Sequence, residues 1–242
     1  MAENNFKGDF QMATYVVSDI HGEFYKYIKM LELINFNDED NLYILGDTLD
    51  RGPDPIKLLL DMSMRSNVFP LLGNHELMAI DILETLLVEI KEENCESQID
   101  AEVIGKLMEY QNNGGDITLK QFKELPYEER FDLLDYLKDF ELYDVVDVGD
   151  KTFILSHTGN IDSNKKLSKH SVEELVFIRA DYDKQVFADP NIFLVSGHTP
   201  TLAITGKPEI YYKNNNINID CGAAFGGRLA CLRLDDLKEF YI

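Results

Sequence analysis

The chain has 242 residues, of which 45% are hydrophobic, 28% charged and 11% aromatic, a composition typical of a folded globular protein. Its 44 Asp and Glu residues outnumber 23 Lys and Arg, and the resulting charge of −21 argues against a nucleic-acid-binding or membrane-surface protein. Residues 1–12 lack a signal-peptide core, and Cys95, Cys221 and Cys231 have neither disulfide nor zinc-site spacing, so we expect a cytoplasmic location.

The first third of the chain alternates strand-like and helix-like patterns. Strands are predicted over residues 13–18, 41–45 and 68–72, where β-branched and aromatic residues gather. Helices are predicted over residues 23–34, 53–62 and about 76–92, where apolar residues recur at helical spacing. This alternation indicates an α/β architecture.

The segment from about 85 to 142 is acidic and helix-periodic, with one break at Asn113-Gly114-Gly115. We interpret it as a helical insertion within a single domain that spans residues 1–242. Beyond it, Ser171 and Glu174 form a capping box that predicts a short helix. The other predicted elements are strands over residues 143–148, 152–156, 192–195, 209–212, 217–219 and 229–234.

Polar residues follow five of the predicted strands directly. They are Asp19, His21, Asp47, Asn74, His75, His157 and His198, and they include four of the five histidines. Because the carboxyl ends of strands in α/β sheets converge on a ligand crevice, we expect these side chains to meet. Imidazole, carboxylate and amide ligands suit divalent manganese, iron or zinc, and they suffice for two ions if one aspartate bridges.

Three motifs carry a family resemblance. Asp19-x-His21-Gly22, Gly46-Asp47-x-x-Asp50-Arg51-Gly52 and Gly73-Asn74-His75-Glu76 resemble the signature blocks of the calcineurin-like metallophosphoesterases. Within that superfamily they resemble the bacterial and phage members of the phosphoprotein phosphatase branch. The resemblance implies a sandwich of two mixed β-sheets flanked by helices, with residues 85–142 capping one rim.

The resemblance also implies a role for each site residue. Asp19 and His21 would hold the first metal ion, Asp47 would bridge both ions, and Asn74, His157 and His198 would hold the second. Arg51, Asn74 and Arg179 would bind the substrate phosphate. His75 would act as general acid, oriented by Asp50. The chain departs from the family pattern at His157-Thr158-Gly159, where alanine is usual, and in lacking a tryptophan before Arg179.

The expected activity is therefore metal-dependent phosphomonoester hydrolysis by in-line attack of a metal-activated hydroxide, with manganese expected first and iron or zinc as alternatives. The expected substrate is phosphoserine or phosphothreonine in a protein or peptide. The alternative is a symmetrical dinucleoside tetraphosphate hydrolase, whose third block commonly ends in aspartate, so Glu76 favours the phosphoprotein substrate. A catalytically dead binding scaffold is disfavoured, because every ligand is present. His170 is expected to be a solvated surface residue, and no oligomeric state is predicted.

Overall fold

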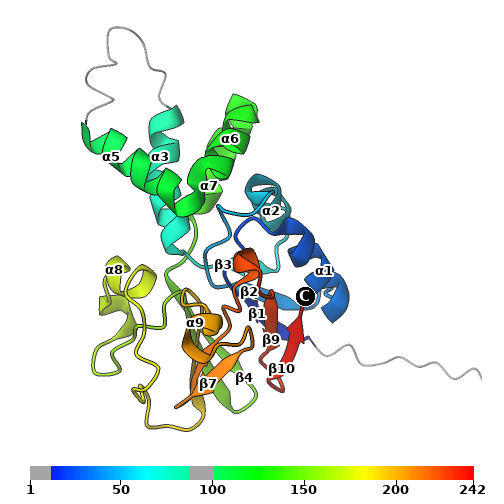
Figure 1. Ribbon diagram of the computed structural model, residues 1–242. Helices are drawn as coiled ribbons and strands as arrows, with labels where there is room; N and C mark the ends of the chain where they lie inside the picture. The colour runs from blue at the N-terminus through cyan, green and yellow to red at the C-terminus, as the bar shows by residue number, and fades with distance from the viewer. Residues whose placement is uncertain (1–11, 88–100) are drawn as a thin grey trace, which may run out of the picture.

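Two five-stranded sheets form the centre of the protein in the computed structural model, which describes residues 12–87 and 101–242 (Figure 1). The strand order is β10-β9-β1-β2-β3 in the first sheet and β4-β5-β6-β8-β7 in the second. Both sheets mix parallel and antiparallel pairs. The expected α/β sandwich of two mixed sheets is confirmed.

The first sheet contains β1 (Thr14–Val17), β2 (Asn41–Ile44), β3 (Val68–Pro70), β9 (Ala230–Arg233) and β10 (Lys238–Tyr241). The second contains β4 (Tyr143–Val148), β5 (Lys151–Ser156), β6 (Ile192–Ser196), β7 (Tyr211–Lys213) and β8 (Asn216–Asn218). The α-helices are α1 (Phe24–Ile34), α2 (Pro55–Ser63), α3 (Asn74–Leu87), α5 (Ala101–Tyr110), α6 (Asp116–Glu124), α7 (Tyr127–Lys138), α8 (Val172–Val176) and α9 (Thr201–Thr205). Short 3₁₀ segments cover Leu167–Lys169 and Ala223–Phe225, and a π-turn covers Gln111–Gly115.

The apolar core consists of three clusters, because successive side chains of a strand point to opposite faces of its sheet. In β1, Val16 faces the core between the sheets, whereas Tyr15 and Val17 face the helices on the outer side. Successive side chains of a strand point to opposite faces, so a strand of four buried residues serves both layers. A third cluster, which includes Leu175 and Val176 of α8, covers the outer face of the second sheet.

Parallel pairing aligns the carboxyl ends of the strands that precede the polar motifs. Val17 of β1 pairs with Ile44 of β2, and Leu155 of β5 pairs with Val195 of β6. The loops after these strands therefore leave the sheets at one edge, beneath the tier formed by α3, α5, α6 and α7 (Figure 1).

Most boundaries agree with the predicted elements to within two or three residues. The third predicted helix begins at Asn74, and its expected end beyond residue 87 lies outside the described residues, as does Cys95. Strand β10 and helix α9 were not predicted. The short strand β10 follows the charged pair Asp235-Asp236 and pairs with β9 at the sheet edge. Among the described residues, no helix is long and apolar enough to span a membrane.

Candidate functional site

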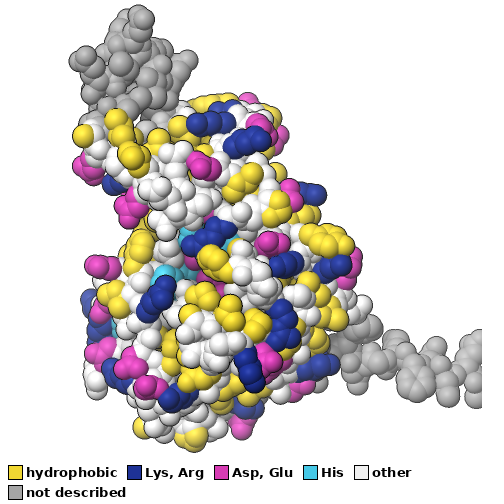
Figure 2. Space-filling view, viewed as in Figure 1, with side chains coloured by type: hydrophobic (Ala, Val, Ile, Leu, Met, Phe, Trp, Pro, Cys, Tyr) yellow, Lys and Arg dark blue, Asp and Glu magenta, His cyan; other side chains and the backbone are white. Residues whose placement is uncertain are grey.

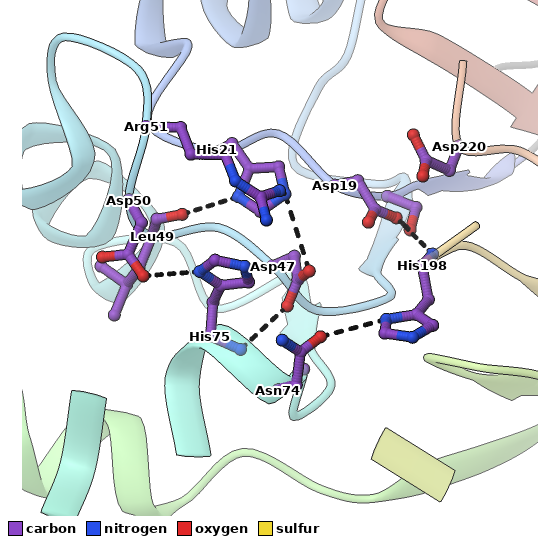
Figure 3. A network of polar contacts seen from close by, with 12 residues as sticks. Asp19, His21, Asp47, Leu49, Asp50, Arg51, Asn74, His75, His198 and Asp220 are labelled. Atoms are coloured by element: carbon purple, nitrogen blue, oxygen red, sulfur yellow. Dashed lines mark hydrogen bonds and ion pairs between the residues drawn. The ribbon is translucent and has the colours of Figure 1, made fainter. Parts of the chain in front are cut away.

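The loops after β1, β2, β5 and β6 and the start of α3 meet at one edge of the sandwich. Figure 3 shows polar side chains from the loops after β1, β2 and β6 and from α3 facing one another. The backbone there is unusual. Asp19, His21, Asp47, Asp50, Arg51 and His198 all have φ between 47° and 69°, a region that non-glycine residues rarely occupy. Backbone strain of this kind persists where the surrounding structure imposes it, and it gathers at functional sites.

Three ligand atoms converge on one side of Asp47. His157 Nε2 lies 3.0 Å from His198 Nδ1 and 3.2 Å from Asn74 Oδ1, and the last two atoms are 3.0 Å apart. His157 Nδ1 faces the Leu45 carbonyl at 2.7 Å, so the proton of this imidazole sits on Nδ1 and Nε2 carries the lone pair. The Phe177 backbone carbonyl lies beside the His198 imidazole, and a proton on the nitrogen that faces it would likewise leave Nδ1 as an acceptor.

The three converging atoms are thus acceptors that face one another without a donor between them. Such an arrangement is repulsive unless a cation occupies the centre, and two imidazoles with an amide oxygen suit a transition metal. Asp47 Oδ1 lies 3.5 Å from His157 Nε2 and can join the set. The donor chemistry therefore fits a divalent ion held by Asp47, Asn74, His157 and His198.

A second cluster lies on the other side of Asp47. Its Oδ2 is 3.6 Å from His21 Nε2, and ligand atoms of His21, Asp47 and His75 lie within 4.8 Å of one another. His21 Nδ1 faces the Leu49 carbonyl at 2.8 Å, so Nε2 carries the lone pair and faces the cluster. One carboxylate thus presents an oxygen to each cluster, which is the geometry that a bridging ligand requires.

Asp19 lies beside the two clusters, and its carboxylate accepts hydrogen bonds from neighbouring donors. Its Oδ2 accepts hydrogen bonds from the Ser18 hydroxyl and from the His198 backbone N–H, the latter at 2.9 Å. The loop that follows β8 brings Asp220, a buried acid that the sequence motifs did not single out, into the same region (Figure 3). Asp220 Oδ1 accepts the Gly222 N–H at 2.9 Å, which marks it as an organiser of that turn.

Electrostatics support a cation at this edge. Burial, followed by mutual repulsion, raises the pKa of Asp47 and Asp220 well above the ordinary carboxyl value, and burial also raises the pKa of Asp19. Three carboxyl groups buried so closely cost free energy unless positive charge neutralises them. Divalent ions would supply that charge, and Asp19, His21, Asp47, Asn74, His157 and His198 are the residues that would hold them.

His75 and Asp50 form a buried hydrogen-bonded pair. His75 Nδ1 lies 2.6 Å from Asp50 Oδ2, while the other Asp50 oxygen accepts hydrogen bonds from Tyr110 Oη at 2.6 Å and Thr118 Oγ1 at 2.5 Å. Burial raises the pKa of Asp50 to about 6, and burial together with Arg51 lowers the pKa of His75 to about 2. Tyr110 and Thr118 come from the helical insertion and were missed, because no local motif marks them.

Glu76 has a structural role in the loop that carries Asp47. Its fully buried carboxylate accepts the backbone N–H groups of Asp47, Thr48, Leu49 and Gly73 at 2.8–3.1 Å, and the Thr48 hydroxyl at 2.9 Å. The side chain fixes the loop that carries Asp47, and both oxygens are engaged by that loop. Glu76 therefore has a structural role in this loop, and its contacts do not bear on the substrate.

Arg51 stands at the mouth of the site. Its guanidinium contacts His21 Nε2 and lies 4.8 Å from the ring centre of Phe225, which is 56% exposed. Its backbone N–H donates to the Gly114 carbonyl at 3.1 Å, and a side chain at Gly114 (φ 100°) would collide with Arg51 Cγ. The Asn-Gly-Gly turn thus shapes this rim.

Two further residues complete the comparison with the sequence predictions. Arg179 is exposed, and its charge helps to lower the pKa of His198 to about 3, behind burial and His157. His170 was expected at the surface, but it is buried, and its Nε2 accepts the Asp162 N–H at 2.8 Å. The imidazole closes the loop that runs from residue 162 to 170, which is why it lies inside.

Comparison with known proteins gives consistent results. A symmetrical bis(5'-nucleosyl)-tetraphosphatase of Wigglesworthia glossinidia brevipalpis is 41% identical over 90 residues, which cover 36% of this chain and 33% of that protein. One of Proteus mirabilis is 22% identical over 269 aligned residues, which cover 95% of this chain and 97% of that protein. The chain thus spans only about a third of the first relative and nearly all of the second.

Solved structures share the fold. A presumed diadenosine tetraphosphatase superposes with a TM-score of 0.68 at 15% identity over 97% of this chain and 94% of that one. A serine/threonine phosphatase of Saccharomyces cerevisiae superposes with a TM-score of 0.53 at 12% identity over 96% and 79%.

These findings correct the expected partner. The curated relatives are named for the hydrolysis of dinucleoside tetraphosphates, which are small nucleotides, so the expectation of a phosphorylated protein or peptide was wrong. The profile of the calcineurin-like phosphoesterases matches residues 12–230. With that match, the two-sheet sandwich and the acceptor clusters on either side of Asp47, the chain belongs to the calcineurin-like phosphoesterase family.

Proposed function

We propose that the protein hydrolyses dinucleoside tetraphosphates symmetrically, so that one water and one dinucleoside tetraphosphate give two nucleoside diphosphates. The observation that carries the proposal is the carboxylate of Asp47, which presents one oxygen to each of two acceptor clusters. The similarity to a tetraphosphatase along nearly the whole chain supports the substrate. Manganese is the ion we expect, with iron or zinc sharing the same ligands.

The proposed ions would be held by Asp19, His21 and Asp47 on one side and by Asp47, Asn74, His157 and His198 on the other. When bound, such a pair polarises phosphoryl oxygens and lowers the pKa of water. The protein's own contribution is preorganisation. Carbonyls of Leu45 and Leu49 fix the two imidazoles, and Glu76 fixes the loop that carries Asp47.

Arg51 and Arg179 would bind the polyphosphate. A chain of four phosphates is strongly anionic, and most of this surface would repel it, given the net charge of −21. The two guanidiniums are side chains near the clusters that can hold phosphate oxygens through a planar fork. Phe225 stacks on Arg51 and limits its rotamers, so the guanidinium is oriented before substrate arrives.

His75 would move the proton at its Nε2. Asp50 holds Nδ1, so the opposite nitrogen faces the cluster that includes His21. Burial keeps the imidazole neutral, but the negative charge of a bound polyphosphate favours its protonated form. His75 could then protonate the leaving phosphate oxygen, which is the role of general acid.

The test compares substrates in the presence of Mn²⁺. We expect kcat/KM for diadenosine tetraphosphate to exceed that for each member of a phosphoserine and phosphothreonine peptide panel by at least about 100-fold, a difference of roughly 3 kcal/mol in transition-state binding. The variant Asp47→Asn serves as the control for contaminating phosphatases. Equal or faster peptide hydrolysis would refute the proposal.

A further inference from the structure

A small apolar cavity opens beside the metal-ligating residues. It has a volume of about 210 Å³ and is lined by Leu77, Met78, Asp81, Lys106, Glu109 and Phe177, which come from α3, α5 and the end of α8. The volume falls below the roughly 300–1,000 Å³ of sites that enclose a whole drug-sized ligand, so it suits one moiety of a larger molecule. Figure 2 shows exposed hydrophobic side chains next to the histidines of the site.

The cavity is continuous with the site through two elements. Asn74 and His75 begin α3, and the helical rise of 1.5 Å per residue places Leu77 and Asp81 about 4.5 and 10 Å further along its axis than Asn74. On the opposite wall, the Phe177 backbone carbonyl lies beside the His198 imidazole. A group in the cavity would therefore lie within about 10 Å of Asn74 along the helix axis.

The wall that carries Phe177 is held rigidly. The capping box of Ser171 and Glu174 fixes the start of α8, and Thr158, next to His157, bonds the carbonyls of Glu174 and Leu175. The N–H of Phe177 closes the helix on the Glu173 carbonyl at 3.0 Å. The ring remains 40% exposed, although a fixed aromatic side chain costs free energy when water contacts it.

We propose that this cavity binds the aromatic base of a nucleotide substrate, with Phe177 as the stacking surface and Leu77 and Met78 as apolar walls. The inference rests on the proposed function. A phosphate is an unsuitable occupant, because Asp81 and Glu109 stand at the rim. Lys106 Nζ pairs with Asp81 Oδ2 at 3.3 Å and with Glu102 Oε1 at 3.5 Å, so Glu109 is the lining carboxylate placed to accept a hydrogen bond from an exocyclic amino group. In the proposed substrate, two phosphates and a ribose separate the base from the cleaved bond. This length is similar to the separation of Asn74 and Asp81 along α3.

The test uses calorimetric titration of the Mn²⁺-loaded protein with ADP and with inorganic pyrophosphate, which lacks a base. ADP should bind about 5- to 100-fold more tightly than pyrophosphate, the increment expected from stacking of one base. Phe177→Ala should remove most of that ratio. Ile178→Ala is the matched control, since Ile178 is 43% exposed and adjacent but does not line the cavity, and it should keep the ratio.

The inference is overturned if wild-type protein binds ADP no better than pyrophosphate, or if Phe177→Ala leaves the ratio unchanged. Failure of the proposed function gives a different result, because intact diadenosine tetraphosphate would then persist after incubation with the Mn²⁺-loaded enzyme whatever the titrations show. Binding of the base and turnover of the dinucleotide are thus read separately.

Discussion

Replacement of Glu76 by glutamine tests whether a buried carboxylate fixes the loop of Asp47. One oxygen accepts the N–H groups of Asp47 and Gly73, and the other accepts three donors from Thr48 and Leu49. The glutamine amide will turn its NH₂ toward the pair with fewer donors, so two buried N–H groups lose their acceptor. Each unsatisfied group costs about 1–3 kcal/mol, which predicts a loss of about 2–6 kcal/mol.

Urea unfolding of the metal-free protein measures this loss directly. A domain's free energy of unfolding is about 5–15 kcal/mol, so the expected change is a large fraction of the total. Glu84→Gln on the same helix is the matched control, because Glu84 is half exposed and, within residues 12–87 and 101–242, its ion pair is with Lys138 at 2.6 Å. Such a surface pair is worth about 0–1 kcal/mol. A Glu76→Gln loss no larger than that of the control would refute the reasoning.

Three further predictions concern the site. His75→Asn should lower kcat by about 10²–10⁴-fold, which is the usual contribution of a general acid. The amount of bound manganese, measured by elemental analysis, should not change. A variant that loses both its activity and its manganese would contradict the assigned role. Burial raises the pKa of Asp19, Asp47 and Asp220, so the stability that they confer is present at acid pH and is lost as pH rises through their folded pKa. The Tm difference between Mn²⁺-loaded and EDTA-treated protein should therefore widen from about pH 5 to about pH 8, and a constant difference would argue against it. Phe225→Leu removes a cation–π contact with Arg51 of about 0.5–1 kcal/mol. The variant should therefore raise KM about two- to fivefold at nearly constant kcat. An unchanged KM would show that the Phe225 ring does not orient Arg51.

The sequence predicted those elements whose signal lies within a few neighbouring residues. The β-branched segments, the capping box at Ser171 and the motifs at strand ends each carry their signal within a few residues, and the structure places them as expected. Strand β10 was missed because it is only four residues long and begins with two charged residues, and β9 supplies its pairing partner only in the fold. His170 was misplaced for a similar reason, since its burial depends on a loop that folds back over it.

The supporting residues of the site could not be predicted, because their partners are remote in sequence. Tyr110 and Thr118 reach Asp50 across 60 and 68 residues. The expected phosphoprotein substrate was overturned by the named relatives, and only the folded structure reveals the role of Glu76, whose contacts reach the backbone of residues 47–49. A motif therefore identifies the residues that gather at a site, but not which of them contact the ligand.

The nucleotide products of diadenosine tetraphosphate, separated by ion-exchange chromatography after incubation with the Mn²⁺-loaded protein, test the account most directly. Cleavage at the central bridge predicts ADP alone, two molecules for each substrate consumed. ATP together with AMP, or a substrate that survives intact, would contradict the account.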